Sequence, residues 1–138
     1  MTDPVSTLVD SNVWLDVFGH PGPWRDWSLR AVARAYDEGI LCVNPIVYAE
    51  ISVRFDMLEE LEGWLSPHEV EREQLPYDAA FLAGKAFAEY RRRGGTKRSP
   101  LPDFYIGAHA AVRGYRLLTR DTARYRTYFP KLDVLGPD

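Results

Sequence analysis

The chain has 138 residues, of which 46% are hydrophobic and 13% aromatic. This length and composition predict a single globular domain over residues 1–138 that can bury a core. The apolar runs are too short to span a bilayer, and the N-terminus lacks the basic and apolar regions of a signal segment, so we expect a cytoplasmic protein with no membrane partner. One cysteine, Cys42, excludes an internal disulfide, and its apolar neighbours predict a core residue.

The net charge of -3 combines two halves of opposite sign. Residues 1–90 carry 6 Lys and Arg against 16 Asp and Glu, whereas residues 91–138 carry 11 against 4. A basic face can therefore attract phosphates in spite of the acidic total. Its densest part is residues 91–98, hereafter the basic segment. The residues in it that we predict to contact phosphates are Arg92, Arg93, Lys97 and Arg98. A solvated helix end is the alternative interpretation.

In chain order, the first half predicts a strand over residues 6–10, a helix over 24–38, a strand over 40–43, and helices over 45–55 and 56–65. The first helix is closed by Gly39. Asn44 offers an N-cap and Pro45 suits the first helical position, so the second strand should pass directly into a helix.

The second half predicts, in order, a strand or extended connection over residues 70–75, helices over 77–93 and 102–113, a strand over 115–118, a short helix after Asp121 and a last strand over 131–135. Gly94 and Gly95 end the first of these helices, and Gly114 turns the chain after the second. Alternating strands and helices predict an α/β fold with a central parallel sheet between two helical layers.

Four carboxylates lie beside apolar elements: Asp10, Glu50, Asp103 and Asp121. Asp10 and Asp121 each follow a predicted strand, which places them at the carboxyl edge of a parallel sheet, where open α/β folds build their sites. Glu50 and Asp103 lie on apolar helical segments. Burying negative charges together is unfavourable unless a cation neutralises them, and Mg²⁺ prefers oxygen ligands. The four acids together predict a divalent metal site.

Each acid also has an ordinary explanation. Asp10 and Asp121 can cap the helices that follow them, and Asp103 lies in a first helical turn, where the helix dipole favours an acid. Glu50 can pair with Arg54 one turn later, although its other helical neighbours are apolar. The joint pattern favours the metal site over four separate explanations.

Other metal and phosphate chemistries fit less well. His20, His68 and His109 lack the spacing of a zinc site, and His109 is interpreted as a packed or locally hydrogen-bonded helix residue. A phosphatase of the haloacid dehalogenase type normally needs a second aspartate two positions after the first, where this chain has Asn12. A binding module that holds a structural cation without catalysis is the remaining alternative.

The ordered motifs resemble a known family. They are Asp-Ser-Asn-Val at residues 10–13, the helix of Glu50, Pro-Asp-Phe-Tyr-Ile-Gly-Ala at 102–108, and Thr-Arg-Asp at 119–121. Over nearly the full length they are similar to the PIN-domain ribonucleases, and more closely to the VapC toxins of bacterial and archaeal toxin-antitoxin pairs. The usual small residues after the third acid are partly replaced by Tyr105 and His109.

The resemblance implies a three-layer α/β/α domain in which the first and fourth strands are neighbours. It implies that Asp10, Glu50, Asp103 and Asp121 form the acidic site, with Thr119 and Asn12 as supporting polar groups. Mg²⁺ or Mn²⁺ held there would activate water to cleave an RNA phosphodiester bond, and the basic segment would hold the RNA backbone. The family also implies a cognate antitoxin that covers the site, and a homodimer.

Overall fold

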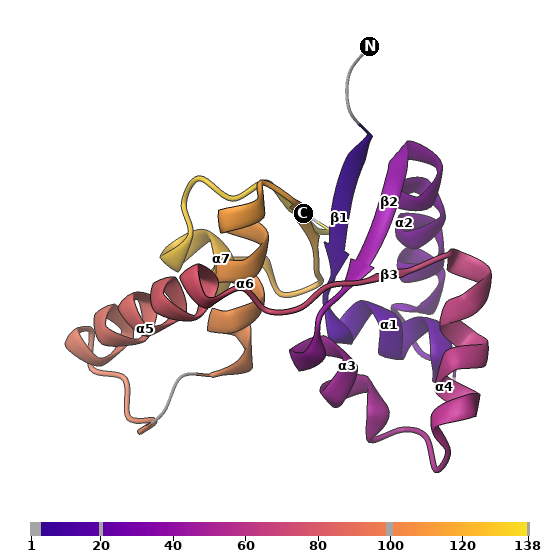
Figure 1. Ribbon diagram of the computed structural model, residues 1–138, viewed down its shortest axis with the longest axis horizontal. Helices are drawn as coiled ribbons and strands as arrows, with labels where there is room; N and C mark the ends of the chain where they lie inside the picture. The colour runs from indigo at the N-terminus through magenta and orange to yellow at the C-terminus, as the bar shows by residue number, and fades with distance from the viewer. Residues whose placement is uncertain (1–3, 20, 99–100, 138) are drawn as a thin grey trace.

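The computed structural model describes residues 4–19, 21–98 and 101–137. Five parallel strands form one sheet in the order β3-β2-β1-β4-β5 (Figure 1). They are β1 (Val5–Val9), β2 (Gly39–Val43), β3 (Glu71–Arg72), β4 (Arg116–Leu118) and β5 (Val134–Leu135). The first strand is central and pairs with β2 on one side and with β4 on the other. The predicted neighbour relation of the first and fourth strands is therefore confirmed.

Helices cover both faces of the sheet, so the predicted three-layer α/β/α fold is confirmed. The helices are α1 (Ser11–Phe18), α2 (Arg25–Glu38), α3 (Pro45–Ser52), α4 (Leu58–Leu65), the short 3-10 helix η1 (Ser66–His68), α5 (Tyr77–Arg92), α6 (Pro102–Arg113) and α7 (Thr122–Tyr128). In Figure 1, α1, α2 and α4 lie on one side of the sheet, and α5, α6 and α7 lie on the other. Asn44 caps α3 as predicted, since its Oδ1 accepts a hydrogen bond of 2.9 Å from the Val47 amide.

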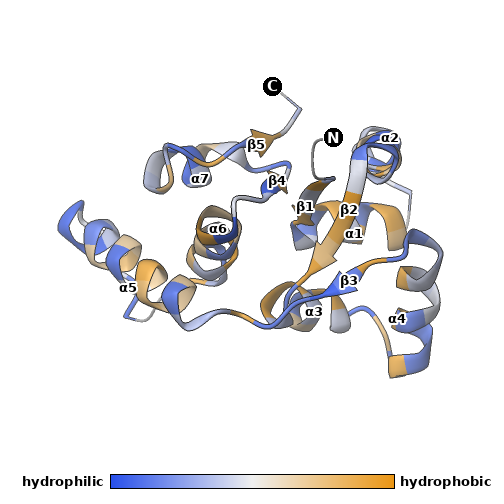
Figure 2. Ribbon diagram, turned by 45° about the horizontal axis from the view of Figure 1, so that its top comes forward, coloured by the Kyte–Doolittle hydropathy of each residue, from blue (hydrophilic) through white to orange (hydrophobic). Residues whose placement is uncertain are grey.

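The core lies between the sheet and the two helical layers. Figure 2 shows β1 and β2 as the apolar centre, with hydrophilic segments on the outer faces of α2 and α5. Leu8, Trp14, Cys42 and Phe104 are fully buried, which confirms the core assignment of the cysteine. In the described part of the chain, no helix combines the length and apolarity needed to cross a membrane.

Some element boundaries differ from the prediction. Helix α1 was not predicted as a separate element, although an Asp10 cap was considered, and it buries Val13, Trp14 and Val17. Residues 70–75 contribute only the two-residue strand β3, and α3 ends at Ser52 rather than at residue 55. These differences fall where short segments take their conformation from tertiary packing rather than from a local signal.

Candidate active site

The parallel pairing of β1 and β4 brings Asp10 and Thr119 to the same sheet edge. Asp10 is 3% exposed, and its Oδ2 accepts hydrogen bonds from the Thr119 hydroxyl at 2.9 Å and from the Tyr125 hydroxyl at 3.0 Å. Its Oδ1 accepts a hydrogen bond of 2.8 Å from the Ser11 amide, and its backbone carbonyl accepts hydrogen bonds from the first turn of α1. Asp10 therefore both caps a helix and presents a buried carboxylate at the carboxyl edge of the sheet.

Ser11 links the first acid to the second. Its hydroxyl donates a hydrogen bond of 3.0 Å to Glu50 Oε1 from α3, while its amide holds Asp10. No ion pair joins Glu50 to Arg54, although both lie in the described part of the chain, so this alternative is not supported. The Glu50 carboxylate points toward the end of β1 rather than along its own helix.

Tyr125 joins the first acid to the third. Its side chain is 1% exposed, and its hydroxyl lies 3.0 Å from Asp10 Oδ2 and 3.3 Å from Asp103 Oδ1. A phenol has one proton and can donate fully to only one of these oxygens at a time. Asp103, in the first turn of α6, also lies 3.5 Å from Arg124. The two carboxylates are thus within reach of a single hydroxyl group.

Asp121 stands at the open side of the cluster. Its side chain is exposed and makes no capping hydrogen bond to α7, contrary to the capping alternative. Thr119 donates its hydroxyl to Asp10, and the same oxygen accepts a hydrogen bond of 3.1 Å from the Asp121 amide. Asn12 supports the same corner, because its amide group donates to Thr119 and its Oδ1 accepts from the Arg120 amide.

The basic segment follows from the end of α5. Arg92 and Arg93 are exposed and both pair with Glu89, which partly neutralises them. The ring of Tyr90 packs edge-on against Phe104, the residue after Asp103, and its hydroxyl accepts a hydrogen bond of 3.4 Å from the Lys97 amide. The basic segment therefore lies beside the start of α6, on the Asp103 side of the cluster.

The family model of the PIN domain matches residues 7–130. The chain belongs to the PIN-domain family. Its fold resembles VapBC2 from Rickettsia felis bound to a DNA fragment from their promoter, with a TM-score of 0.71 and 17% identity over 97% of this chain and 100% of that one. It also resembles VapBC-1 from nontypeable Haemophilus influenzae, with a TM-score of 0.71 and 15% identity over 96% and 98% of the two chains. The fold is also similar to FitAcB from Neisseria gonorrhoeae, with a TM-score of 0.68 and 17% identity over 95% of this chain and 97% of that one. No curated protein sequence matches the chain.

The acids of this PIN domain repel one another. Burial raises the pKa of Asp10, and the nearby Asp103 raises it further, while hydrogen bonds from Thr119 and Tyr125 oppose the shift. Burial also raises the pKa of Glu50 and of Asp103. Arg124 lowers the pKa of Asp103, whereas Asp121 raises it. The surroundings of Asp10, Glu50 and Asp103 therefore stabilise their negative charges incompletely, which is the electrostatic condition that a bound cation relieves.

The donor set of the PIN-domain site fits a hard divalent ion. Divalent-metal dependence is general among PIN domains. Within the described residues, no three acidic, histidine or cysteine side chains converge closely enough to enclose one ion. Mg²⁺ keeps several waters and is commonly bound by only one or two carboxylates, a pattern that Asp10 and Asp103 satisfy. The zinc alternative gains no support, because His68 bonds Trp64 and His109 contacts Asn44, while His20 lies outside the described residues.

Two site residues were not predicted. Ser11 belongs to the Asp-Ser-Asn-Val motif, but only the fold reveals that it bridges Asp10 and Glu50. Tyr125 lies four residues after Asp121, the residue before α7, which is the spacing of one helical turn. This spacing is the only sequence signal for the role of Tyr125. Gly107 of α6 lies against the rings of Phe129 and Tyr125, and a side chain there would crowd both.

Proposed function

We propose that this PIN domain is a divalent-metal-dependent endoribonuclease and the toxin of a type II toxin-antitoxin pair of the VapBC kind. The observation that carries the proposal is the linked set of acids at the carboxyl edge of the sheet, in which Tyr125 contacts both Asp10 and Asp103 and Ser11 contacts Glu50. PIN-domain VapC toxins are nucleases, and several proteins of similar fold are VapBC or FitAcB complexes.

In this proposal Asp10 and Asp103 hold Mg²⁺ or Mn²⁺, with Glu50 and Asp121 completing the site directly or through water. When bound, the ion lowers the pKa of a water molecule and neutralises charge on the phosphate. Ser11 and Thr119 orient the acids, with Asn12 supporting Thr119. We expect the guanidinium of Arg124, which is partly exposed and 3.5 Å from Asp103, to contact the phosphate as well. Arg92, Arg93, Lys97 and Arg98 hold the RNA backbone next to α6.

An antitoxin and a second copy of the chain are the proposed protein partners. The support for the antitoxin is that the structures of similar fold include complexes described as VapBC, and the chains matched in them are of almost the same length as this one. Aromatic side chains on the surface, among them Trp64 with 44% exposure, offer contact area for such partners.

RNA cleavage by the purified protein tests the proposal. We expect cleavage with Mg²⁺ or Mn²⁺, none after chelation, and none with Asp103→Asn in either metal. The ends produced in cellular RNA after controlled expression then identify the cleavage sequence. Binding of metal without any cleavage of RNA would favour the non-catalytic metal-binding module, and release of phosphate from small phosphate esters would favour a phosphatase.

A further inference from the structure

An exposed tryptophan is fixed beside the acidic site. Trp24 is 39% exposed, and the guanidinium of Arg120 lies over its ring, 5.4 Å from the centroid. Arg120 is itself held by Asp16 through contacts of 2.6 and 3.2 Å, and Asp16 accepts the Ser28 hydroxyl at 2.6 Å. This chain of contacts orders a ring that has Arg120 over one face and is partly exposed to solvent. An ordered, partly exposed aromatic ring is a group on which a base can stack.

The fixed tryptophan is connected to the active site by one short path. The Arg120 amide donates to Asn12 Oδ1 at 3.2 Å, and the Asn12 amide group donates to Thr119, which bonds Asp10. Arg120 therefore joins the ring of Trp24 by a cation-π contact to the hydrogen bonds that reach Asp10 at the end of β4.

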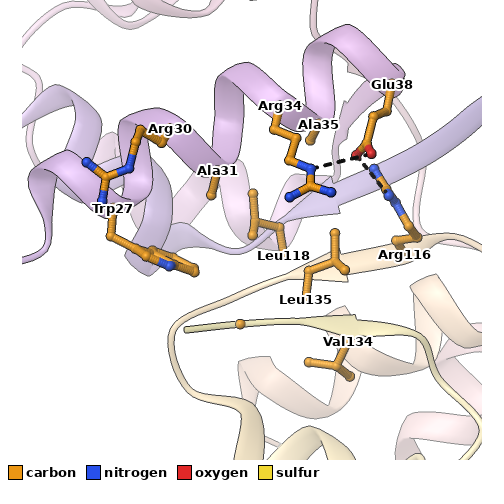
Figure 3. Close-up of a pocket in the computed structure, with 11 residues that line it drawn as sticks. Trp27, Arg30, Ala31, Arg34, Ala35, Glu38, Arg116, Leu118, Val134 and Leu135 are labelled. Carbon is orange, nitrogen blue, oxygen red and sulfur yellow. Dashed lines mark ion pairs between the residues drawn. The ribbon is translucent and has the colours of Figure 1, made fainter. Parts of the chain in front are cut away.

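Trp24 also contacts a residue that lines a groove. Its ring packs edge-on against Trp27, with 6.1 Å between centroids, and Trp27 lines a hollow of about 580 Å³ between α2 and the strands β4 and β5. Figure 3 shows Trp27 and Arg30 toward one end of this groove and Arg34, Glu38 and Arg116 toward the other. Hereafter this hollow is called the α2 groove.

The α2 groove carries an excess of positive charge. Its lining includes Arg30, Arg34 and Arg116 but only one carboxylate, Glu38, which pairs with Arg34 at 3.6 Å and with Arg116 at 3.1 Å (Figure 3). Arg30 makes no ion pair within the described chain, and Nη2 of Arg116 is buried without a hydrogen-bond partner there. Three arginines against one carboxylate leave the lining with a net positive charge, which complements an anionic ligand.

We propose that Trp24 and the α2 groove bind the single-stranded RNA that flanks the cleavage site. Trp24 stacks on a base, and Arg30 and Arg34 contact the phosphates of the nucleotides that follow. The proposal rests on the ribonuclease function proposed above. Aromatic faces combined with arginine are the usual means of holding single-stranded nucleic acid, and here they lead away from the acids that act on it. An acidic protein segment would match the charge but gives no role to the fixed Trp24 ring.

Binding of a short fluorescein-labelled single-stranded RNA of mixed sequence tests this, measured by anisotropy in EDTA over a salt series. Replacing Arg30 and Arg34 by Gln should reduce the slope of log Kd against log salt by between about 0.7 and about 1.4, since each phosphate contact with a single strand contributes about 0.7 and Glu38 already pairs with Arg34. Trp24→Leu should weaken binding about tenfold and leave the slope unchanged, because stacking is not ionic. The double variant Lys85→Gln, Arg113→Gln is the control for the arginine pair, and Tyr77→Leu, at an aromatic residue with 93% exposure, is the control for Trp24→Leu. Thermal melting checks that all variants fold.

The outcomes separate this inference from the proposed function. The inference is supported if the groove variants lose RNA affinity or salt slope as expected and the control variants bind RNA like the wild type. If the wild type binds and cleaves RNA but the groove variants keep the wild-type salt slope and affinity, the groove assignment is wrong and the ribonuclease function still stands. A wild type that neither binds nor cleaves RNA overturns both. Groove variants that keep RNA affinity but lose the antitoxin overturn the inference by identifying a protein interface.

Discussion

Tyr125 is the residue that most directly couples the two metal-binding candidates. Tyr125→Phe removes only the hydroxyl that contacts Asp10 and Asp103 and keeps the buried ring. Because outer groups that orient ligands typically change metal affinity or activity by about 10–100-fold, we expect a fall of that size in Mn²⁺ affinity or in cleavage rate, with RNA binding unchanged.

Calorimetric Mn²⁺ titration and single-turnover cleavage measure the two effects of Tyr125→Phe separately. Tyr128→Phe is the matched control, because Tyr128 lies on the same helix and its hydroxyl makes no hydrogen bond in the described structure. If both variants retain wild-type Mn²⁺ affinity and rate, the Tyr125 hydroxyl only fills space.

Replacement by asparagine should separate Asp10 from Asp103. Both oxygens of Asp10 accept hydrogen bonds, one from the Ser11 amide and the other from the Thr119 and Tyr125 hydroxyls. In either orientation, the side-chain NH₂ of an asparagine at this position would therefore face a hydrogen-bond donor. Asp10→Asn should lower the free energy of unfolding of the metal-free protein by about 1–3 kcal/mol.

Asp103→Asn should do the opposite in the absence of metal. The pKa of Asp103 is raised by burial and by Asp121, so its charge is a net cost to the folded state. We expect an increase in Tm of roughly 2–4 °C in EDTA. Thermal melting of both variants in the same buffer is the measurement, and equal shifts for the two would mean that hydrogen bonding and charge do not distinguish these acids.

At the scale of elements, the packing of α7 against α6 positions Tyr125. A Cβ added at Gly107 would lie 2.5 Å from a ring carbon of Phe129 and 3.0 Å from one of Tyr125. Gly107→Ala should therefore push α7 away and destabilise the protein by about 1–3 kcal/mol, with loss of cleavage. Gly84→Ala, on the surface of α5 with nothing within 4 Å of the added Cβ, should be neutral or slightly stabilising. Urea unfolding and cleavage assays compare the two, and equal effects would contradict this account of the packing.

The basic segment is the second element whose role can be isolated. Replacing Arg92, Arg93, Lys97 and Arg98 by Gln should weaken RNA binding and flatten its salt dependence, because fewer counterions are released. The change should be smaller than four free contacts would give, since Glu89 already pairs with Arg92 and Arg93. Mn²⁺ affinity should not change. An unchanged salt slope would identify this segment as a solvated helix end.

How well the sequence predicts the structure differs from one helix to another. The Asn44 and Pro45 signals start α3 at the predicted residue, and the four acids are recognisable because each borders an apolar segment. By contrast, α1 was not assigned, although Val13, Trp14 and Val17 in residues 11–18 recur at helical spacing and are buried together. The role of Tyr125 is also hidden, because Tyr128 lies in the same short helix and only the fold shows which of the two hydroxyls reaches Asp10 and Asp103.

At the scale of the whole molecule, the two oppositely charged halves of the chain meet at the site. The acidic half contributes Asp10 and Glu50, whereas the basic half contributes Asp103 and Asp121 together with Arg124. Strand β1 from the first half lies between β2 and β4, so the sheet itself brings the halves together. Completion of the acidic cluster therefore requires the whole fold, and metal binding should be lost in one step when the protein unfolds.

The stability of the protein should depend jointly on pH and on metal. In the folded state the pKa values of Asp10, Glu50 and Asp103 lie above their ordinary values of 3.8 and 4.5. A raised acid pKa means that the folded state binds protons more readily than the unfolded state. The resulting penalty is absent below the unfolded pKa and grows as pH rises through the folded pKa.

Bound Mg²⁺ should offset this penalty, and protons should compete with it for the same oxygens. At about 100 times the Kd, a ligand specific for the folded state adds about 2.7 kcal/mol to the free energy of unfolding. We expect the increase in Tm on adding Mg²⁺ to be large near pH 8 and to decline toward about pH 5, while Asp103→Asn loses most of it at every pH. Paired melting curves in EDTA and in Mg²⁺ measure this, with Ca²⁺-free buffer throughout. A stabilisation that stays constant across this range, or is greatest at the acidic end, would mean that the ion binds away from these carboxylates.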